Sequence, residues 1–317
     1  MSELQARLEA RAAALAIVRD FFAQRRVLEV DTPVLSATTT PDPNLHSLTT
    51  RLACRPGVPW YLHTSPEFAM KRLIAAGAGD IYQIARVFRD AELGDHHQPE
   101  FTLIEWYRVG WDEVRLMGEV IELITALLPS GGHITPAAHI SYRDAFEQYC
   151  GLDPLGATTV QLQQRATELG LAIPAHCASA NDLLDLMLTT LVAPQLGQSG
   201  PTILFDFPAS QAALAERQPH DPRVAARFEV FLHGVELANG FRELTDPIEQ
   251  RQRFEQELRQ RQRRGLPAVS IDERFLESMD SLPPCSGVAL GFDRLLMLAI
   301  AEPRIDAVMT LPIEVTP

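Results

Sequence analysis

Lysine and cysteine are both scarce in this sequence. Lys71 is the only lysine among 28 basic residues, the others being arginines, and we attribute this bias to genomic base composition. The four cysteines, Cys54, Cys150, Cys177 and Cys285, are widely separated and include no Cys-x-x-Cys pair. The sequence therefore indicates neither a disulfide framework nor a zinc site, and we expect buried free thiols.

Long apolar runs and excess positive charge are also missing. No stretch approaches the roughly 20 apolar residues that span a bilayer, and the N-terminus lacks the apolar core of a signal peptide, so we expect a cytoplasmic protein with no membrane segment. The formal charge of -13 counts against extensive contact with nucleic acid and favours a basic protein partner. The 317 residues, 46% of them hydrophobic, can fill a substantial core.

Helix and strand signals are clear in the first 128 residues. Ser2 and Gln5 are spaced as in a capping box, and apolar residues recur at helical spacing until about Arg26. Two β-type runs, 81–89 and 101–109, flank a polar loop. They predict an antiparallel hairpin with a long connection.

The rest of the chain adds short helices and further strands. Residues 129–200 are broken by glycine and proline, which predicts a small helical insertion. A charged helix starts at the cap Asp246, and an apolar helix starts at Phe292. Strands are predicted at 202–207, 227–241 and 286–290. Because hairpins dominate and no βαβ pattern repeats, we expect an α+β fold with an antiparallel sheet flanked by helices, in a single domain over 1–317.

The hairpin carries the first candidate functional residues. Arg89 stands at the end of its first strand, and Glu105 and Tyr107 share one face of its second strand by the period of two. Such a hairpin could hold a phosphate and an ammonium together. The alternative is a hairpin with incidental surface charges.

The second candidate segment contains two acidic residues within the predicted strand 227–241. Glu229 and Glu236 would lie on opposite faces of one regular strand, but a bulge at Gly234 would bring both carboxylates to one side. Hard oxygen ligands of this kind suit Mg²⁺ bound partly through nucleotide phosphates. Asn239, Phe241 and Glu243 alternate onto one face that could receive a small polar cation. Acidic residues on an edge strand are the alternative.

The third segment, 287–294, places small residues before a helix that Arg294 opens. Small residues let a backbone approach a ligand closely. On its own this segment is equally typical of a plain strand-to-helix connection.

Together and in this order, the three segments match the ordered motifs of class II aminoacyl-tRNA synthetases. The chain resembles the catalytic core of lysyl-tRNA synthetases over nearly its whole length, most weakly over 129–200. Within that group it is most similar to the truncated paralogues that act as elongation factor P lysine ligases. The matching runs are Thr64–Glu67, the hairpin, Phe207–Ala212, Glu236–Phe241 and Ser286–Gly291.

The resemblance implies a two-part pocket for ATP and an amino acid. By the family pattern, Arg89 and Arg294 hold the ATP phosphates and are catalytic, whereas Glu229 and Glu236 carry Mg²⁺. The positions expected at ATP are Arg89, Glu92, Gln98, Glu236, Leu237, Gly291 and Arg294. The positions expected at the amino acid are Ser65, Glu67, Glu105, Tyr107, Asn239, Phe241, Glu243 and Ala289.

Three positions distinguish this sequence from lysyl-tRNA synthetases. The family usually reads adenine with a Glu where this chain has Ala91, and we expect the neighbouring Glu92 to serve through a shift of the loop. Gln98 replaces the usual Asn, which keeps the amide and lengthens its reach. Ala289 replaces a Gly, and its methyl group would crowd α-lysine more than (R)-β-lysine. The alternative is that Ala289 merely fills a gap in the core.

The resemblance implies an ATP-dependent ligase that activates (R)-β-lysine or lysine as an adenylate and transfers it to a lysine of elongation factor P. We expect a homodimer through the opening helix and Pro33. A lysyl-tRNA ligase is one alternative, disfavoured by the negative charge and by the lack of an anticodon-binding domain before the core. An inactive paralogue that binds amino acid or nucleotide is another, disfavoured because both arginines and both metal carboxylates are retained.

Overall fold

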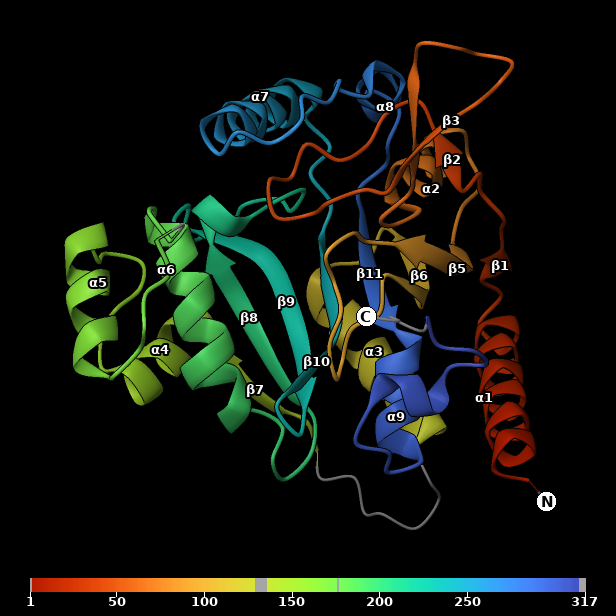
Figure 1. Ribbon diagram of the computed structural model, residues 1–317, viewed down its shortest axis with the longest axis horizontal. Coiled ribbons are helices and arrows are strands. Elements are labelled where there is room, and N and C mark those ends of the chain that lie inside the picture. The colour runs from red at the N-terminus through yellow and green to blue at the C-terminus, as the bar shows by residue number, and fades with distance from the viewer. Residues whose placement is uncertain (1, 129–135, 176, 314–317) are drawn as a thin grey trace. The chain divides into compact units, whose positions relative to one another are not determined.

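The computed structural model describes residues 2–128, 136–175 and 177–313 (Figure 1). The chain divides into two compact units. Unit one comprises residues 1–110, 123–130 and 245–317, and unit two comprises residues 111–122 and 131–244. Helix α3 (Glu113–Leu127) belongs to unit two up to residue 122 and to unit one beyond it.

Unit one contains four strands of the main sheet. Their order is β1-β5-β6-β11, with β1 parallel to β5 and the other neighbours antiparallel. Their bounds are Leu28–Glu29 for β1, Ile81–Phe88 for β5, Glu100–Val109 for β6 and Cys285–Gly291 for β11. A small antiparallel sheet is formed by β2 (Leu35–Ser36), β4 (Pro59–Leu62) and β3 (Thr49–Arg51).

The helices of unit one pack on these strands and on one another. They are α1 (Glu3–Gln24), α2 (Glu67–Ala75), α7 (Pro247–Arg263), α8 (Glu273–Met279) and α9 (Phe292–Ala299), with a 3-10 turn at Ile305–Val308. Phe22 of α1 stacks on Tyr82 at 4.3 Å between ring centroids and lies edge-on to Trp106 at 5.3 Å. Trp106 is fully buried, so α1 covers one face of β5 and β6.

Unit two contains the other four strands, in the order β10-β9-β8-β7. Strand β7 is parallel to β8, and the other neighbours are antiparallel. The strands are β7 (Ala138–Ser141), β8 (Thr202–Pro208), β9 (Val224–Leu232) and β10 (Val235–Arg242). The helices are α4 (Tyr142–Cys150), α5 (Thr159–Glu168) and α6 (Ala180–Met187), followed by a π-helical turn at Leu188–Val192 and 3-10 turns at Ala193–Gln195 and Ala209–Gln211.

The helices of unit two share one apolar core with its strands. Figure 1 shows α4, α5 and α6 gathered beside β7 and β8. Tyr142 and Phe146 of α4 stack at 4.5 Å and pack with Leu204 and Phe207 of β8. Burial of such side chains removes apolar area from water and holds the helices against the sheet.

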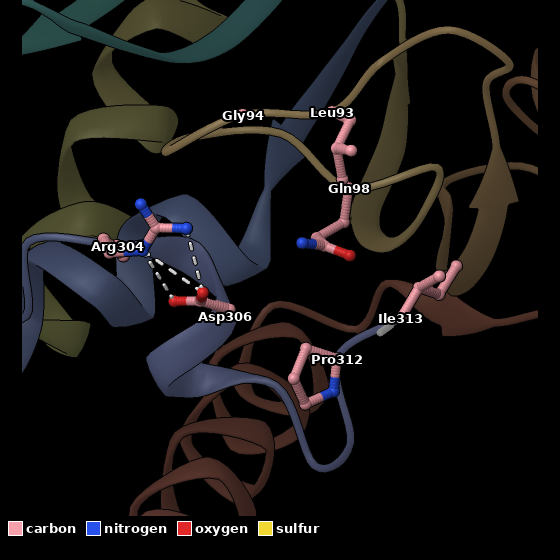
Figure 2. A pocket seen from close by; sticks show the side chains of 7 residues that line it. All are labelled: Leu93, Gly94, Gln98, Arg304, Asp306, Pro312 and Ile313. Atoms are coloured by element: carbon pink, nitrogen blue, oxygen red, sulfur yellow. Dashed lines mark hydrogen bonds and ion pairs between the residues drawn. The ribbon is translucent and has the colours of Figure 1, made fainter. Parts of the chain in front are cut away.

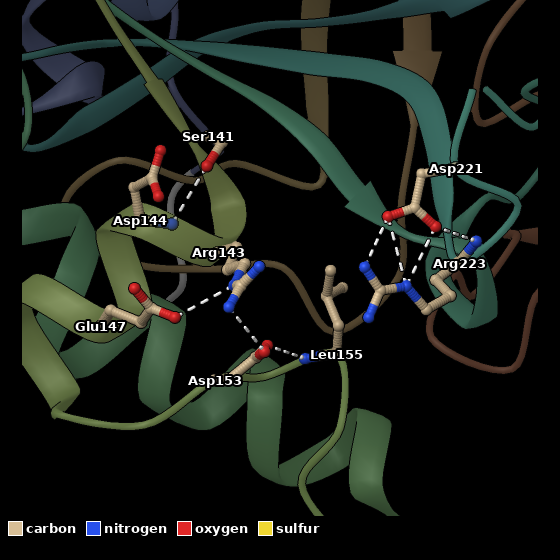
Figure 3. Close-up of polar contacts among 8 residues, drawn as sticks. All are labelled: Ser141, Arg143, Asp144, Glu147, Asp153, Leu155, Asp221 and Arg223. Carbon is tan, nitrogen blue, oxygen red and sulfur yellow. Dashed lines mark hydrogen bonds and ion pairs between the residues drawn. The ribbon is translucent and has the colours of Figure 1, made fainter. Parts of the chain in front are cut away.

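Polar contacts cap the start of α4 and hold the loop that follows it. Figure 3 shows Ser141 accepting the Asp144 N–H at 3.0 Å, which caps α4. Arg143 reaches both Glu147 at 3.0 Å and Asp153 at 3.2 Å. Asp153 also accepts the Leu155 N–H, so the loop after α4 is tied back to the helix. The same view shows Asp221 pairing with Arg223.

The predicted α+β class with an antiparallel sheet and flanking helices is confirmed. The antiparallel hairpin of β5 and β6 is confirmed too, in the register Ile81↔Tyr107 to Phe88↔Glu100. Within 129–200 the described residues hold α4, α5 and α6, whereas residues 129–135 and 176 lie outside the described part. That this segment is an insertion, and that 1–317 is a single domain, stay predictions.

The expectation of buried free thiols holds only in part. All four cysteines are free, and Cys150 and Cys285 are buried, but Cys54 is exposed. Among the described residues, no group of three or more His, Cys, Asp or Glu side chains is placed to hold a metal ion.

None of the described helices is both long and apolar enough to cross a membrane.

Candidate active site

A buried carboxylate, Glu105, lies at the centre of the unit-one candidate site. It is 2% exposed, and each of its oxygens accepts a hydrogen bond: one from the Tyr107 hydroxyl and one from the Ser65 hydroxyl, both at 2.7 Å. The pKa of Glu105 is raised to about 7, mainly by burial and then by the nearby charge of Glu67, whereas the two hydrogen bonds and Lys71 oppose the rise. The carboxyl is therefore poised to ionise when a cation arrives.

A second carboxylate, Glu67, opens helix α2 beside this group. The Ser65 hydroxyl that donates to Glu105 also accepts the Glu67 N–H at 3.0 Å, so one hydroxyl links both residues. Glu67 is paired at 2.6 Å with Lys71, which is 1% exposed. The chain's single lysine is thus a buried partner of a predicted site residue.

Glu257 of α7 is a further carboxyl that interacts with Glu67. Its pKa is raised to about 8, mainly by burial and then by the charge of Asp42, with a smaller contribution from Glu67, against the opposing effects of Arg253 and Arg261. This residue was not among those predicted from the sequence, where α7 shows only a densely charged helix.

Strand pairing places Ala289 beside Glu105. In the ladder Ala289 of β11 lies directly opposite Glu105 of β6, and Gln83 of β5 lies opposite Glu105 on the other side. Partners in a ladder point to the same face of the sheet. The Ala289 methyl group and the Glu105 carboxylate therefore share one face.

The first predicted phosphate arginine, Arg89, follows β5 at the end of the hairpin. Its Nε donates to the Thr64 carbonyl at 3.4 Å, and its guanidinium lies 5.1 Å from the centre of the Phe101 ring. Glu92 approaches Arg89 to 3.8 Å. Ala91 between them has a positive φ of 62°, a strained backbone for a non-glycine residue that turns the loop at this point.

The second predicted phosphate arginine, Arg294, lies in the first turn of α9. Its Nε donates to the His96 carbonyl at 3.2 Å, and Nη2 lies 2.6 Å from Nε2 of His97. Both histidines belong to the hairpin loop, so this arginine holds the loop. Gly291 caps the same helix at its N-terminus.

Gln98 lines a cavity beneath the hairpin loop. It is 5% exposed, and its side-chain oxygen has no hydrogen-bond partner among the described residues. Figure 2 shows its amide extending into a cavity of about 480 Å³. The other lining residues are Leu93, Gly94, Arg304, Asp306, Pro312 and Ile313.

Two acidic residues of unit two lie on one face of the β9–β10 hairpin. Asn239 is opposite Glu229, and Glu236 is opposite Phe231, two residues beyond Glu229 on the same strand. The register shifts between Glu236 and Ala238. The two carboxylates share a side, as predicted. Residues 227–241 form parts of two strands rather than the one strand predicted, and the predicted position of the bulge was wrong.

The extra residue of the bulge is Leu237, whereas Gly234 lies in the hairpin turn. His233 and Gly234 have φ values of 51° and 76°, the left-handed conformation that tight hairpin turns demand. Leu237 is 2% exposed, so its side chain belongs to the core.

An arginine, Arg227, contacts this face. Arg227 donates to Glu229 at 2.6 Å and to the Asn239 side-chain oxygen at 3.3 Å. Burial and then the charge of Glu236 still raise the pKa of Glu229, against Arg227. Two like charges held together on one face favour a bound cation.

The remaining predicted residues of unit two differ in burial. Glu243 is 2% exposed just beyond β10, and it pairs with Ala215 in an isolated bridge. Phe241 is half-buried and packs on Ala212, Ala215 and Ala225. The ring therefore presents only part of its surface to a ligand.

Comparisons with known proteins assign the family of this chain. The model for "tRNA synthetases class II (D, K and N)" matches residues 1–315. The chain belongs to the class II tRNA synthetase family. It is 47% identical over 314 residues to "Elongation factor P--(R)-beta-lysine ligase" of Erwinia tasmaniensis, covering 98% of this chain and 95% of that protein. Proteins of the same name from Salmonella dublin and Salmonella typhimurium are 47% identical over 309 residues, covering 96% of this chain and 94% of each.

Sequence reasoning missed three residues that surround the predicted sites of this family member. Lys71 lies four residues after Glu67, a helical spacing that could have suggested their pairing. Arg227 lies two residues before Glu229, so the period of two could have placed both on one face. No local pattern signals Glu257, because its neighbours Asp42 and Glu67 are distant in the sequence.

The raised pKa of Glu105 predicts a pH-dependent cost to stability. Between pH 4.5 and about 7 the unfolded chain ionises this carboxyl and the folded chain does not, so stability falls as the pH rises through this window. Glu105→Gln removes the effect. We expect the free energy of unfolding of the wild type, relative to this variant, to fall by on the order of 3 kcal/mol from pH 4.5 to 7.5 in urea denaturation. Glu100→Gln, on the same strand but half-exposed, is the control; a pH-independent difference for Glu105→Gln would contradict the raised pKa.

Proposed function

We propose that this protein is an ATP-dependent ligase that activates (R)-β-lysine as an adenylate and transfers it to a lysine side chain of elongation factor P. The observation that carries the proposal is Glu105, a buried carboxylate with a hydroxyl donor on each oxygen and a second carboxylate, Glu67, beside it. The family and the names of relatives that match nearly the whole chain support it.

The acidic group suits the ammonium ends of a lysine substrate. A buried carboxylate is costly alone and gains a strong, charge-assisted hydrogen bond when an ammonium arrives. Glu105, Glu67, Ser65 and Tyr107 would form one part of the substrate contacts in unit one. In unit two, Asn239, Phe241 and Glu243 are the residues that we propose as contacts for an amino acid.

Activation requires the ATP phosphates to be neutralised and oriented. The substrate carboxylate attacks the α-phosphate, the bond to the β-phosphate breaks, and an aminoacyl-adenylate and pyrophosphate form. Arg89 and Arg294 would stabilise the charge on the phosphates, and Glu92, Gln98, Leu237 and Gly291 would contact the nucleotide.

Mg²⁺ fits the carboxylates of unit two. Glu229 and Glu236 share a face, and their mutual repulsion is the kind that a divalent cation relieves. When bound, Mg²⁺ would neutralise phosphate charge. The protein's own contribution is to hold the two carboxylates on one side and to set Arg227 against Glu229.

In the second step the neutral amine of the acceptor lysine attacks the carbonyl of the adenylate. An amide forms, AMP leaves, and the amine loses a proton. No serine or cysteine nucleophile is needed. We further propose a cytoplasmic homodimer that uses α1 and Pro33 for self-association and does not act on tRNA.

A mass-resolved assay tests the proposal. The enzyme is incubated with MgATP, either (R)-β-lysine or α-lysine, and either elongation factor P or tRNA. We expect pyrophosphate exchange that depends on the amino acid, and addition of one lysyl group to elongation factor P. Acylated tRNA would favour a lysyl-tRNA ligase, and binding without exchange would favour an inactive paralogue.

The metal assignment predicts that Glu229→Gln and Glu236→Gln each lower adenylate formation and raise the Mg²⁺ requirement. Each change removes a charged ligand and keeps the shape. Pyrophosphate exchange across a Mg²⁺ titration measures the effect, with Glu216→Gln, a half-exposed carboxylate of unit two, as the control. Wild-type exchange in both variants at limiting Mg²⁺ would refute the assignment.

The amino-acid contacts predict that Glu105→Ala or Glu243→Ala raises the KM for the amino acid far more than that for ATP. An ammonium that loses its buried carboxylate partner should lose on the order of 2–5 kcal/mol of binding. The control is Glu100→Ala. A raised KM for ATP with an unchanged KM for the amino acid would mean that the two groups of contacts are reversed.

The position of Ala289 predicts a preference between lysine isomers. Its methyl group shares a face with Glu105, so it would crowd an amino group on the α-carbon more than one on the β-carbon. A methyl-sized change is worth about 1–3 kcal/mol, so we expect a preference for (R)-β-lysine that Ala289→Gly reduces. Exchange rates with both lysines measure it. Equal use of both by the wild type, or no gain of α-lysine activity in the variant, would defeat the steric argument.

A further inference from the structure

A buried aspartate, Asp293, joins three segments of unit one that are far apart in the sequence. It is 1% exposed in the first turn of α9. One of its oxygens accepts from Arg11 of α1 at 2.5 Å, and the other accepts the Thr102 backbone N–H of β6 at 2.6 Å. The β6–β11 ladder ends at Leu103↔Gly291, so this carboxylate takes the next ladder position in place of a backbone carbonyl.

Arg11 also contacts the residues beside Asp293. Its second terminal nitrogen donates to the Thr102 hydroxyl at 2.7 Å, and its guanidinium lies 4.9 Å from the centre of the Phe292 ring. Arg11 is 7% exposed and Thr102 is 4% exposed. A buried, ionised carboxylate persists when a countercharge and hydrogen bonds satisfy it, and Arg11 and Thr102 supply both here.

The neighbours of these residues are the two phosphate arginines. Asp293 directly precedes Arg294 in α9. Thr102 directly follows Phe101, whose ring lies 5.1 Å from the Arg89 guanidinium. The Asp293–Thr102 hydrogen bond therefore fixes the start of α9 against the strand that supports Arg89.

We propose that Asp293, held by Arg11, is a positioning residue for ATP activation. It sets the separation of Arg89 and Arg294, so that both guanidinium groups meet one triphosphate. The inference rests on the proposed function, and it adds a role for α1 in the geometry of the nucleotide contacts. Small displacements of such groups matter because a misplacement of about 1 Å can cost about 10²-fold in rate.

The other end of β6 provides a matched control. There Asp80 accepts the Val109 backbone N–H at 2.7 Å and pairs with Arg108 at 2.9 Å. An aspartate again binds a strand N–H and an arginine, but neither phosphate arginine is adjacent. Asp80→Asn should therefore cost stability without changing the response to ATP.

The test compares Asp293→Asn with Asp80→Asn in the full-length enzyme. Asparagine keeps the shape and one acceptor oxygen but leaves the arginine without its countercharge. We expect Asp293→Asn to lower the kcat of pyrophosphate exchange by about 10²-fold and to weaken MgATP binding in calorimetry, with the KM for the amino acid unchanged. Asp80→Asn should retain wild-type values for all three. Thermal unfolding of both variants reports their folding.

The outcomes distinguish failure of the positioning role from failure of the proposed function. If both variants behave alike in kcat and ATP affinity while the wild type is active, the positioning role is overturned and the proposed function stands. A wild type with neither exchange nor ATP binding overturns both. If Asp293→Asn does not fold, Thr102→Val replaces it, because valine keeps the shape and loses only the Arg11 contact. A fall in kcat with weaker ATP binding then supports the role, and wild-type values refute it.

Discussion

In unit one, the two-residue alternation of β6 places the candidate site residues on one face of the strand and the residues that pack against α1 on the other. Its odd-numbered residues, Phe101, Glu105 and Tyr107 among them, face the candidate site, whereas Thr102 and Trp106 face α1. A one-residue slip would exchange the two sets and bury the carboxylate against α1. The pairing register of β6 with β5 and β11 therefore determines which residues face the site and which pack against α1. Only one register buries the apolar residues against α1, so the register is strongly specified.

In unit two the β9–β10 hairpin also determines which side chains share a face. The two-residue turn pairs Glu236 with Phe231, two residues beyond Glu229, so the turn itself brings Glu229 and Glu236 to one face. The extra residue Leu237 then places Asn239, rather than Ala238, opposite Glu229. Two carboxylates therefore lie on one face, and Arg227 pairs with Glu229. Such an arrangement costs stability without a ligand, and proteins tolerate it where a cation is to be bound. The turn thus places the two carboxylates together, and the bulge adds Asn239 opposite Glu229.

Local signals in the sequence predicted the fold well, because they depend on neighbouring residues. The β5–β6 hairpin and the Asp246 cap of α7 were predicted correctly, since alternation and capping act within a few residues. The bulge was assigned to Gly234 because glycine often marks irregular strands, but Gly234 lies in the turn with a positive φ, and the register shifts at Leu237 instead. The pairing of Arg11 with Asp293 spans 282 residues, and no local pattern encodes it.

The scarcity of lysine gains a physical meaning from the position of Lys71. An aminoacyl-adenylate acylates any neutral amine that it meets, so a lysine-rich surface would be a competing acceptor. The only lysine side chain here is 1% exposed and ion-paired with Glu67. An ammonium held by a carboxylate lacks the lone pair that attack requires. Base composition can explain why arginine replaces lysine elsewhere, but burial and pairing explain how a lysine so close to the Glu105 carboxylate can be compatible with the proposed chemistry.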